Sequence, residues 1–498
     1  MNLRLRWALT FFSMVLYWVI PESYYGLWIP YLLGFVLLFG LRDLSNTLTT
    51  LFILSLLLIP SQLYQVTNLS FLKSWLSPLI PLTFLFPSTT LAHQHKRTTG
   101  PRYRYWLRLS GFSTFIGNGA FQVAHGISVF LFAPSRRGLH LAFRSPAFFL
   151  PVLWLLTGLL LKLLHLDGID HLSTAASWIW APLLCLTFAA LNSEQLSIYL
   201  RAIAFGLGLS SAFGVVIWLF NPSIETPILN LLPFISSLHQ ARVPGSHDVW
   251  AATGFFFHRL KFAHLSLLLL PTLLFIPRQR VQAIVAFLVI TAIVLSHAAW
   301  ATIVGGALLA LYVVCKLWKQ PRGEVLVAGA LLCTIAVHLV LLTQPNLSNT
   351  LIAKSPSLQT RQFMATQAIT QIQEQPIGLG HGGYKAWSIN HYPTELNNRQ
   401  LPRTLPHNLG LATLAETGIA GWTIFVALLA YLLSQSMEVL WKTRASKQAK
   451  RLALVIGSGT LTLLGLGMLH DPLYHKPVAF GWMLLLGLSH KLSSDHSI

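Results

Sequence analysis

Long apolar runs recur along this chain of 498 residues, and they restrict its possible folds more than any other feature. Runs approaching 20 residues include 146–165, 199–220 and 452–470. About 20 apolar residues carry a helix across about 30 Å of hydrocarbon, and a helix satisfies its own backbone hydrogen bonds there. The sequence therefore predicts an all-α polytopic membrane protein with about 12–14 transmembrane helices in the lipid bilayer.

The amino-acid composition argues against an ordinary soluble protein. Only 10% of the residues are charged, whereas soluble domains average about 25%. The net charge of +20 comes mostly from Lys and Arg in short segments beside the apolar runs, a pattern that orients membrane helices and does not indicate nucleic-acid binding. The three cysteines lie inside apolar runs without metal-ligand spacing, so the sequence predicts neither a metal nor another cofactor.

Basic connectors in the second half of the chain indicate how its helices are oriented. Residues 277–280, 316–322 and 442–451 are rich in Lys and Arg, which favour the cytoplasmic side. The number of apolar runs between these connectors then places the other polar segments together on the periplasmic face. These segments are 222–260, 296–297, 344–408 and 470–472.

The largest polar segment, 344–408, is too long to be a simple connection, because helix connections usually have about 2–8 residues. It is expected to carry the chemistry and to contain short helices. One helix is predicted at 358–375 on the membrane surface, with Phe363, Ile369 and Ile372 on its apolar side. The predicted regions are an N-terminal transmembrane part at 1–343, a periplasmic catalytic loop at 344–408 and C-terminal transmembrane helices at 409–498.

Three side chains in and after this loop are candidates for chemistry. His407 stands where the chain re-enters the membrane, and an imidazole there can act as a general base or simply be structural. The guanidinium of Arg361 suits a phosphate group, although a snorkelling arginine at the interface is the alternative. Glu416 lies in an apolar helix, where it is expected to pair with an arginine, orient His407 or only pack near the interface.

Two further groups of residues are candidates for substrate binding. Gly378 and Gly380 belong to a glycine-rich turn that can form an anion-binding nest, although a plain tight turn also explains it. Arg242, His258 and Arg259 lie before the apolar run at 261–276, where they could hold an anion or form a solvated basic rim.

Together, Arg361, residues 376–380, His407 with Asn408, and residues 414–421 resemble the signature of the O-antigen ligase and polymerase superfamily of bacterial membrane glycosyltransferases. The similarity covers about residues 250–435 well and rests on hydropathy alone before about residue 200. The resemblance implies a helical fold with a large periplasmic loop, in the bacterial inner membrane. It also implies metal-independent transfer of a glycan from undecaprenyl diphosphate to a hydroxyl of a glycolipid, glycan or protein.

The resemblance also assigns roles to single residues. The family's essential loop histidine and arginine map onto His407, as the base, and Arg361, as a partner of the diphosphate. Many relatives carry Ser-Arg where this chain has Ser296-His297, so Arg242, Arg259 or His297 is expected to supply the missing cation.

Two other functions remain open alongside a ligase. A polymerase of lipid-linked repeat units would use the same chemistry. A non-enzymatic polysaccharide transporter or flippase would instead require charged or broken helices around a midplane cavity, whereas the charges of this sequence gather at one face.

Overall fold

The computed structural model describes the chain in segments. These are residues 101–115, 121, 124–126, 128, 143, 145–164, 178, 180–220, 250–256, 258–317, 356–393, 395–396, 399–400, 405–442 and 445–496.

The described residues are almost entirely helical, which confirms the all-α membrane architecture expected from the sequence. Three of their helices are long and apolar enough to cross a membrane: α12 (Ser193–Phe220), α21 (Leu409–Trp441) and α22 (Lys447–Gly467). The total of about 12–14 spans stays a prediction, because residues 1–100 and 318–355 lie outside the described residues. The other helices are α6 (Pro101–Ser113), α9 (Pro146–Leu164), α11 (Trp180–Ala190), α14 (Arg259–Leu269), α15 (Gln279–Leu295), α16 (Ala299–Leu317), α19 (Pro356–Glu374), α20 (Gly383–His391) and α23 (Lys476–His496), with the 3-10 turns η5 (Gly254–Phe256), η6 (Leu270–Phe275) and η7 (Pro472–Tyr474).

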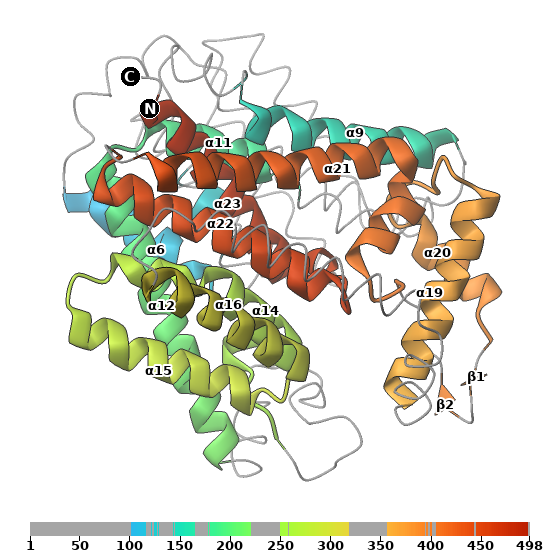
Figure 1. Cartoon of the computed structure of the whole chain (residues 1–498), viewed down its shortest axis with the longest axis horizontal. Helices are drawn as coiled ribbons and strands as arrows, with labels where there is room; N and C mark the ends of the chain where they lie inside the picture. Colours follow the sequence, from blue (N-terminus) through green and yellow to red (C-terminus); the bar gives the residue numbers. More distant parts are fainter. Residues whose placement is uncertain are drawn as a thin grey trace, which may run out of the picture.

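The long helices pack in two groups that share one apolar core (Figure 1). In one group α21 packs against α9 and α22, while α23 packs against α11 and α22. In the other group α12 packs against α6 and α15. Helix α14 joins the two groups, because it contacts α22 and α23 on one side and α15 on the other. The N-terminal ends of α14, α21 and α23 therefore belong to one connected framework.

The polar elements lie at one end of the molecule, beside the start of α21 (Figure 1). Helix α19 confirms the helix predicted at 358–375. Beyond α20, the strands β1 (Glu395–Leu396) and β2 (Arg399–Gln400) form a short antiparallel hairpin that the sequence analysis did not predict. This end therefore combines short helices with one small hairpin.

The buried face of α19 differs from the predicted one. Met364 and Ala368 are fully buried, whereas Ile369, expected on the apolar side, is 42% exposed. Phe363 and Ile372 are only partly buried and flank the buried stripe. The small side chain of Ala368 permits close packing against the apolar cluster at this end of the molecule. This packing, more than the number of apolar residues on each side, decides which face of α19 is buried.

Helix α21 is broken at Gly418, whose φ of 63° and ψ of −171° are not helical. The glycine-rich segment after α19 docks into this break through backbone hydrogen bonds. The Leu379 amide donates to the Ala415 carbonyl at 3.0 Å, and the Gly380 amide donates to the Glu416 carbonyl at 2.7 Å. These bonds satisfy carbonyl groups that the break releases from the helix. The segment at 376–380 and the start of α21 are thus one structural unit.

Replacing Gly418 with alanine is expected to destabilise this unit by on the order of 2 kcal/mol or more, because a left-handed residue gains a Cβ. That Cβ would overlap the carbonyl group of Ile377. Thermal unfolding in detergent measures the effect. Gly306→Ala is the matched control, since a Cβ there meets nothing within 4 Å. Equal melting temperatures for the two variants would contradict the proposed role of the docked loop.

Candidate active site

His407 and Asp471 form the central pair of the polar end. The Nδ1 atom of His407 lies 3.0 Å from Oδ1 of Asp471, and the two side chains are 30% and 10% exposed. The backbone of His407 has a φ of 53°, a left-handed conformation that non-glycine residues rarely adopt. Because Asp471 occupies Nδ1, the other ring nitrogen, Nε2, can meet a ligand.

Asn408 holds His407 in place from the next position in the chain. Its Oδ1 caps α21 by accepting a hydrogen bond from the Leu411 amide at 3.0 Å. Its Nδ2 donates to the carbonyl of Met468 at 3.0 Å, at the end of α22. The start of α21 is thereby tied to the turn that carries Asp471. The His-Asn dipeptide therefore supplies an imidazole together with the residue that anchors it.

The carboxyl group of Asp471 stays ionised near neutral pH. Burial alone would raise its pKa, but the hydrogen bond from His407 and the charges of His407 and His475 outweigh burial and lower the pKa to about 2. An ionised carboxylate accepts a hydrogen bond from Nδ1–H. It therefore favours the tautomer of His407 in which Nε2 is free to accept a proton.

Two arginines, predicted from separate parts of the sequence, lie within electrostatic range of each other. Burial lowers the pKa of Arg361, and nearby Asp471 partly reverses this effect. Burial also lowers the pKa of Arg259, and the charge of Arg361 lowers it further. Nη1 of Arg259 donates to the backbone carbonyl of His297 at 2.8 Å, which fixes the guanidinium beside the start of α16. Both guanidinium groups remain charged at neutral pH and can bind an anion.

A row of imidazoles continues from His407 into the protein. The ring centroids are 6.3 Å apart for His407 and His470, 4.9 Å for His470 and His264, 6.2 Å for His264 and His475, and 5.6 Å for His475 and His258. Burial above all lowers the pKa of His258 and of His470 to about 3, so both rings are neutral near pH 7. His258 therefore lies at the site, but as a neutral ring and not as part of a cationic rim.

The glycine-rich turn does not present an open anion-binding nest. The Gly378 amide donates to the Gln375 carbonyl at 3.0 Å, the Gly380 amide donates to the Glu416 carbonyl, and the Gly382 amide donates to the Glu416 carboxylate at 2.9 Å. A Cβ at Gly378 would overlap the backbone of α21. The amide groups of Gly378 and Gly380 thus bond to protein carbonyls and the glycines allow close packing, as in the plain tight turn that the sequence left open, and a role of this turn in substrate binding stays a prediction.

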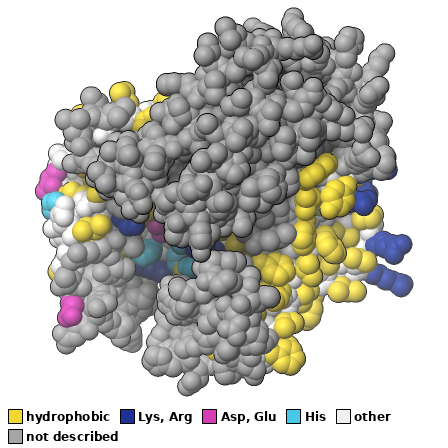
Figure 2. Space-filling view, turned by 180° about the vertical axis from the view of Figure 1, so that it is seen from behind, with side chains coloured by type: hydrophobic (Ala, Val, Ile, Leu, Met, Phe, Trp, Pro, Cys, Tyr) yellow, Lys and Arg dark blue, Asp and Glu magenta, His cyan; other side chains and the backbone are white. Residues whose placement is uncertain are grey.

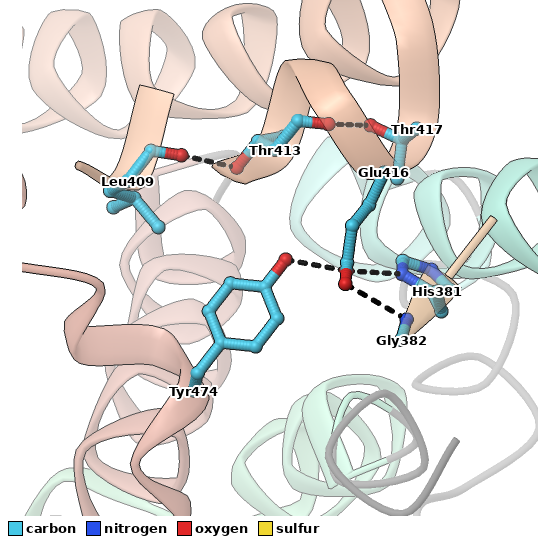
Figure 3. Close-up of polar contacts among 7 residues, drawn as sticks. All are labelled: His381, Gly382, Leu409, Thr413, Glu416, Thr417 and Tyr474. Carbon is cyan, nitrogen blue, oxygen red and sulfur yellow. Dashed lines mark hydrogen bonds and ion pairs between the residues drawn. The ribbon is translucent and has the colours of Figure 1, made fainter. Parts of the chain in front are cut away.

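The sequence left three roles open for Glu416: pairing with an arginine, orienting His407, or only packing. Its carboxylate is 1% exposed and accepts hydrogen bonds from the Tyr474 hydroxyl at 2.6 Å and from the Gly382 amide (Figure 3). Nδ1 of His381 lies 3.9 Å from the same carboxylate. Glu416 therefore contacts neither an arginine nor His407 in the described structure, and its partners belong to the glycine-rich turn and to η7.

The remaining predicted residues divide into two cases. His297 is exposed and also has a left-handed backbone, with a φ of 51°, and it enters the site through its carbonyl group. Arg242 lies outside the described residues. Sequence analysis missed Asp471 as a partner of His407, although Asp471 is one of only 14 acidic residues and belongs to a turn predicted on the same face.

The surface over these elements has distinct polar and apolar regions. In Figure 2, a few histidine, basic and acidic side chains lie close together, while hydrophobic side chains cover another part of the described surface. Among the described residues, no group of three or more His, Cys, Asp or Glu side chains is placed to hold a metal ion. The His407–Asp471 pair and the guanidinium groups of Arg259 and Arg361 are suited to proton transfer and anion binding.

Comparison with known families gives a match to part of the chain. The model of the family described as O-antigen ligase matches residues 282–426, from α15 to the first part of α21. The matched part includes Arg361 and His407 but ends before Asp471. No curated protein matches the chain.

Asp471→Asn is expected to lower the free energy of unfolding at pH 7 by on the order of 2 kcal/mol, because each unit of pKa shift corresponds to about 1.4 kcal/mol. The folded pKa lies below the ordinary value of 3.8, so the stabilisation is complete above about pH 4 and disappears as the pH falls through about 2. Thermal unfolding in detergent across this pH range measures the difference in the free energy of unfolding between wild type and Asp471→Asn.

The control for this measurement is Glu438→Gln, which alters an exposed carboxylate paired with Lys442 within α21. Such exposed pairs contribute at most about 0.5 kcal/mol. A gap between wild type and Asp471→Asn that stays constant from pH 7 to about 2 would contradict an ionised, stabilising Asp471.

Proposed function

We propose that this chain, a member of the O-antigen ligase and polymerase superfamily as the match over residues 282–426 supports, transfers a glycan from undecaprenyl diphosphate to an acceptor hydroxyl at the periplasmic face of the inner membrane. The family supports glycan transfer or polymerisation in general. The observation that carries the finer proposal is the His407–Asp471 pair beside Arg361 and Arg259. A proton acceptor next to an anion site is what displacement of a diphosphate by a hydroxyl requires.

The arginines account for the donor side of the reaction. Arg361 and Arg259 are partly buried and repel each other, so a bound diphosphate would relieve an unfavourable arrangement. Guanidinium groups bind phosphate oxygens through paired hydrogen bonds and hold their charge throughout the reaction. When the bond between the anomeric carbon and the phosphate oxygen breaks, its electron pair passes to the diphosphate, and the two guanidinium groups stabilise the added charge.

His407 and Asp471 account for the acceptor side. As the acceptor oxygen bonds to the anomeric carbon, Nε2 of His407 takes the hydroxyl proton. Asp471 keeps the other ring proton on Nδ1 and stabilises the imidazolium that forms. Proton transfer by a positioned base typically contributes a factor of about 10²–10⁴ to the rate.

This chemistry also separates the candidate functions. A ligase and a polymerase differ in the acceptor, because a polymerase extends one lipid-linked repeat unit with another and gives a ladder of chain lengths. The ligase assignment takes a glycolipid, a glycan or a protein as acceptor. A transporter or flippase would move the lipid-linked glycan without forming a covalent bond, so it would give no product of glycan transfer.

His407→Asn is expected to reduce glycan transfer by a factor of about 10²–10⁴, since the base is lost while a residue that tolerates the left-handed backbone is kept. Transfer by the purified protein from an undecaprenyl diphosphate glycan is measured on gels that resolve single additions from ladders. His391→Ala is the control, because His391 is an exposed imidazole on α20 that bonds to the Trp387 carbonyl of its own helix. Full activity in His407→Asn would overturn the assignment of the base.

Arg361→Ala is expected to raise the KM for the diphosphate donor about tenfold or more, whereas Arg361→Lys retains the charge, loses the paired geometry and recovers part of the loss. Initial rates at varied donor concentration give the KM. Arg278→Ala serves as the control, because Arg278 is an exposed arginine at the start of α15. An unchanged donor KM in Arg361→Ala would show that another group binds the diphosphate.

A further inference from the structure

The proposed mechanism does not use Glu416 and Tyr474, although the Tyr474 hydroxyl donates a hydrogen bond to the buried Glu416 carboxylate at 2.6 Å. We infer that this buried pair positions Asp471, and through it His407, and that Glu416 also holds the glycine-rich turn to the same framework. The inference rests on the proposed function and extends it to two residues that contact neither reacting group.

The first step in the inference is the short path from Tyr474 to Asp471. Asp471 precedes η7, and Tyr474 ends it. The Tyr474 amide donates to the Asp471 carbonyl at 3.0 Å, so a single tight turn joins them. A turn this short has few conformations, and the place at which the Tyr474 side chain is fixed therefore limits where the Asp471 carboxylate can lie.

The second step is the strength of the anchor. The Tyr474 hydroxyl donates to a carboxylate that is 1% exposed, and hydrogen bonds to buried ionised groups are among the strongest in proteins. Burial and the negative charge of Glu416 raise the pKa of Tyr474 well above its ordinary value, so the phenol remains a donor at neutral pH. Loss of this donor would leave a buried carboxylate with one fewer partner.

The third step is the other oxygen of the same carboxylate. Oε1 of Glu416 accepts from the Gly382 amide at 2.9 Å, directly before α20, while Oε2 accepts from Tyr474 (Figure 3). One side chain thus bonds to η7 on one side and to the glycine-rich turn on the other. That turn follows α19, which carries Arg361. Glu416 therefore links η7, which directly follows Asp471, to the turn that follows α19.

The test is Tyr474→Phe, which removes one hydroxyl and keeps the ring. We expect kcat to fall about tenfold to a hundredfold, as a misplacement on the order of 1 Å produces, with an unchanged donor KM. The acid limb of the pH–activity profile is expected to move to lower pH, because an imidazole that is held less closely to a carboxylate loses its proton more readily. Tyr431→Phe is the matched control, since Tyr431 also lies on this framework and bonds to Ser493 at 2.9 Å, at the other end of α21.

A second comparison separates position from charge. In Glu416→Gln, the side-chain carbonyl oxygen can still accept from the Gly382 amide, and the side-chain NH2 group can donate to the Tyr474 oxygen. This variant is therefore expected to retain activity within about threefold of wild type. Glu416→Ala keeps neither and is expected to lose at least about tenfold, as a displaced base would. If Glu416→Gln were as inactive as Glu416→Ala, the charge of Glu416 would matter in itself and the positioning role would be wrong.

The outcomes also distinguish this inference from the proposed function. If wild type transfers glycan and His407→Asn does not, but Tyr474→Phe matches Tyr431→Phe in kcat and in pH profile, the inference alone fails. If Tyr474→Phe lowers only the melting temperature and the amount of active protein, without moving the acid limb, Tyr474 is merely structural and the inference again fails. Absence of transfer by wild type would instead refute the proposed function.

Discussion

The backbone pairing between the glycine-rich turn and the broken start of α21 is the interaction on which the rest of the site depends. It directs the Glu416 side chain towards Gly382 and Tyr474, because the break at Gly418 fixes the turn of α21 that carries Glu416. A straight helix of 33 residues would be about 50 Å long, well beyond the roughly 30 Å of hydrocarbon. The break at Gly418 therefore separates a short first segment, which can lie at the membrane face, from a longer segment that can cross the membrane.

Burial also decides which charges the site presents. The sequence left open whether His258 and Arg259 bind an anion or form a solvated basic rim. In the structure, burial holds His258 and His470 neutral, whereas the guanidinium groups of Arg259 and Arg361 keep their charge. Arg259 and Arg361, with Lys261 beside His258, thus carry the positive charge of this part of the site. Such an arrangement favours a compact anion such as a diphosphate over a diffuse acidic surface.

The sequence predicts the helical membrane class because apolar runs of span length have one main solution in hydrocarbon. It also indicates which residues could carry chemistry, since His407 and Arg361 stand out in a chain that has few charged residues. It does not reveal that Asp471 is the partner of His407, because the two are 64 positions apart and only packing brings them together. A glycine nest and a docked glycine turn look alike in sequence, and they differ only in which group accepts the amide hydrogen bonds.

The docked turn has a consequence for how the protein is made. The carbonyl groups of Ala415 and Glu416 are paired by amides from a segment more than 30 positions earlier in the chain. Ala415 and Glu416 are buried in the folded protein, so water cannot replace these partners there. Biogenesis of this end is therefore coupled: the start of α21 cannot reach its final form until the segment before it has folded against it, and a chain interrupted between them would leave both halves immature.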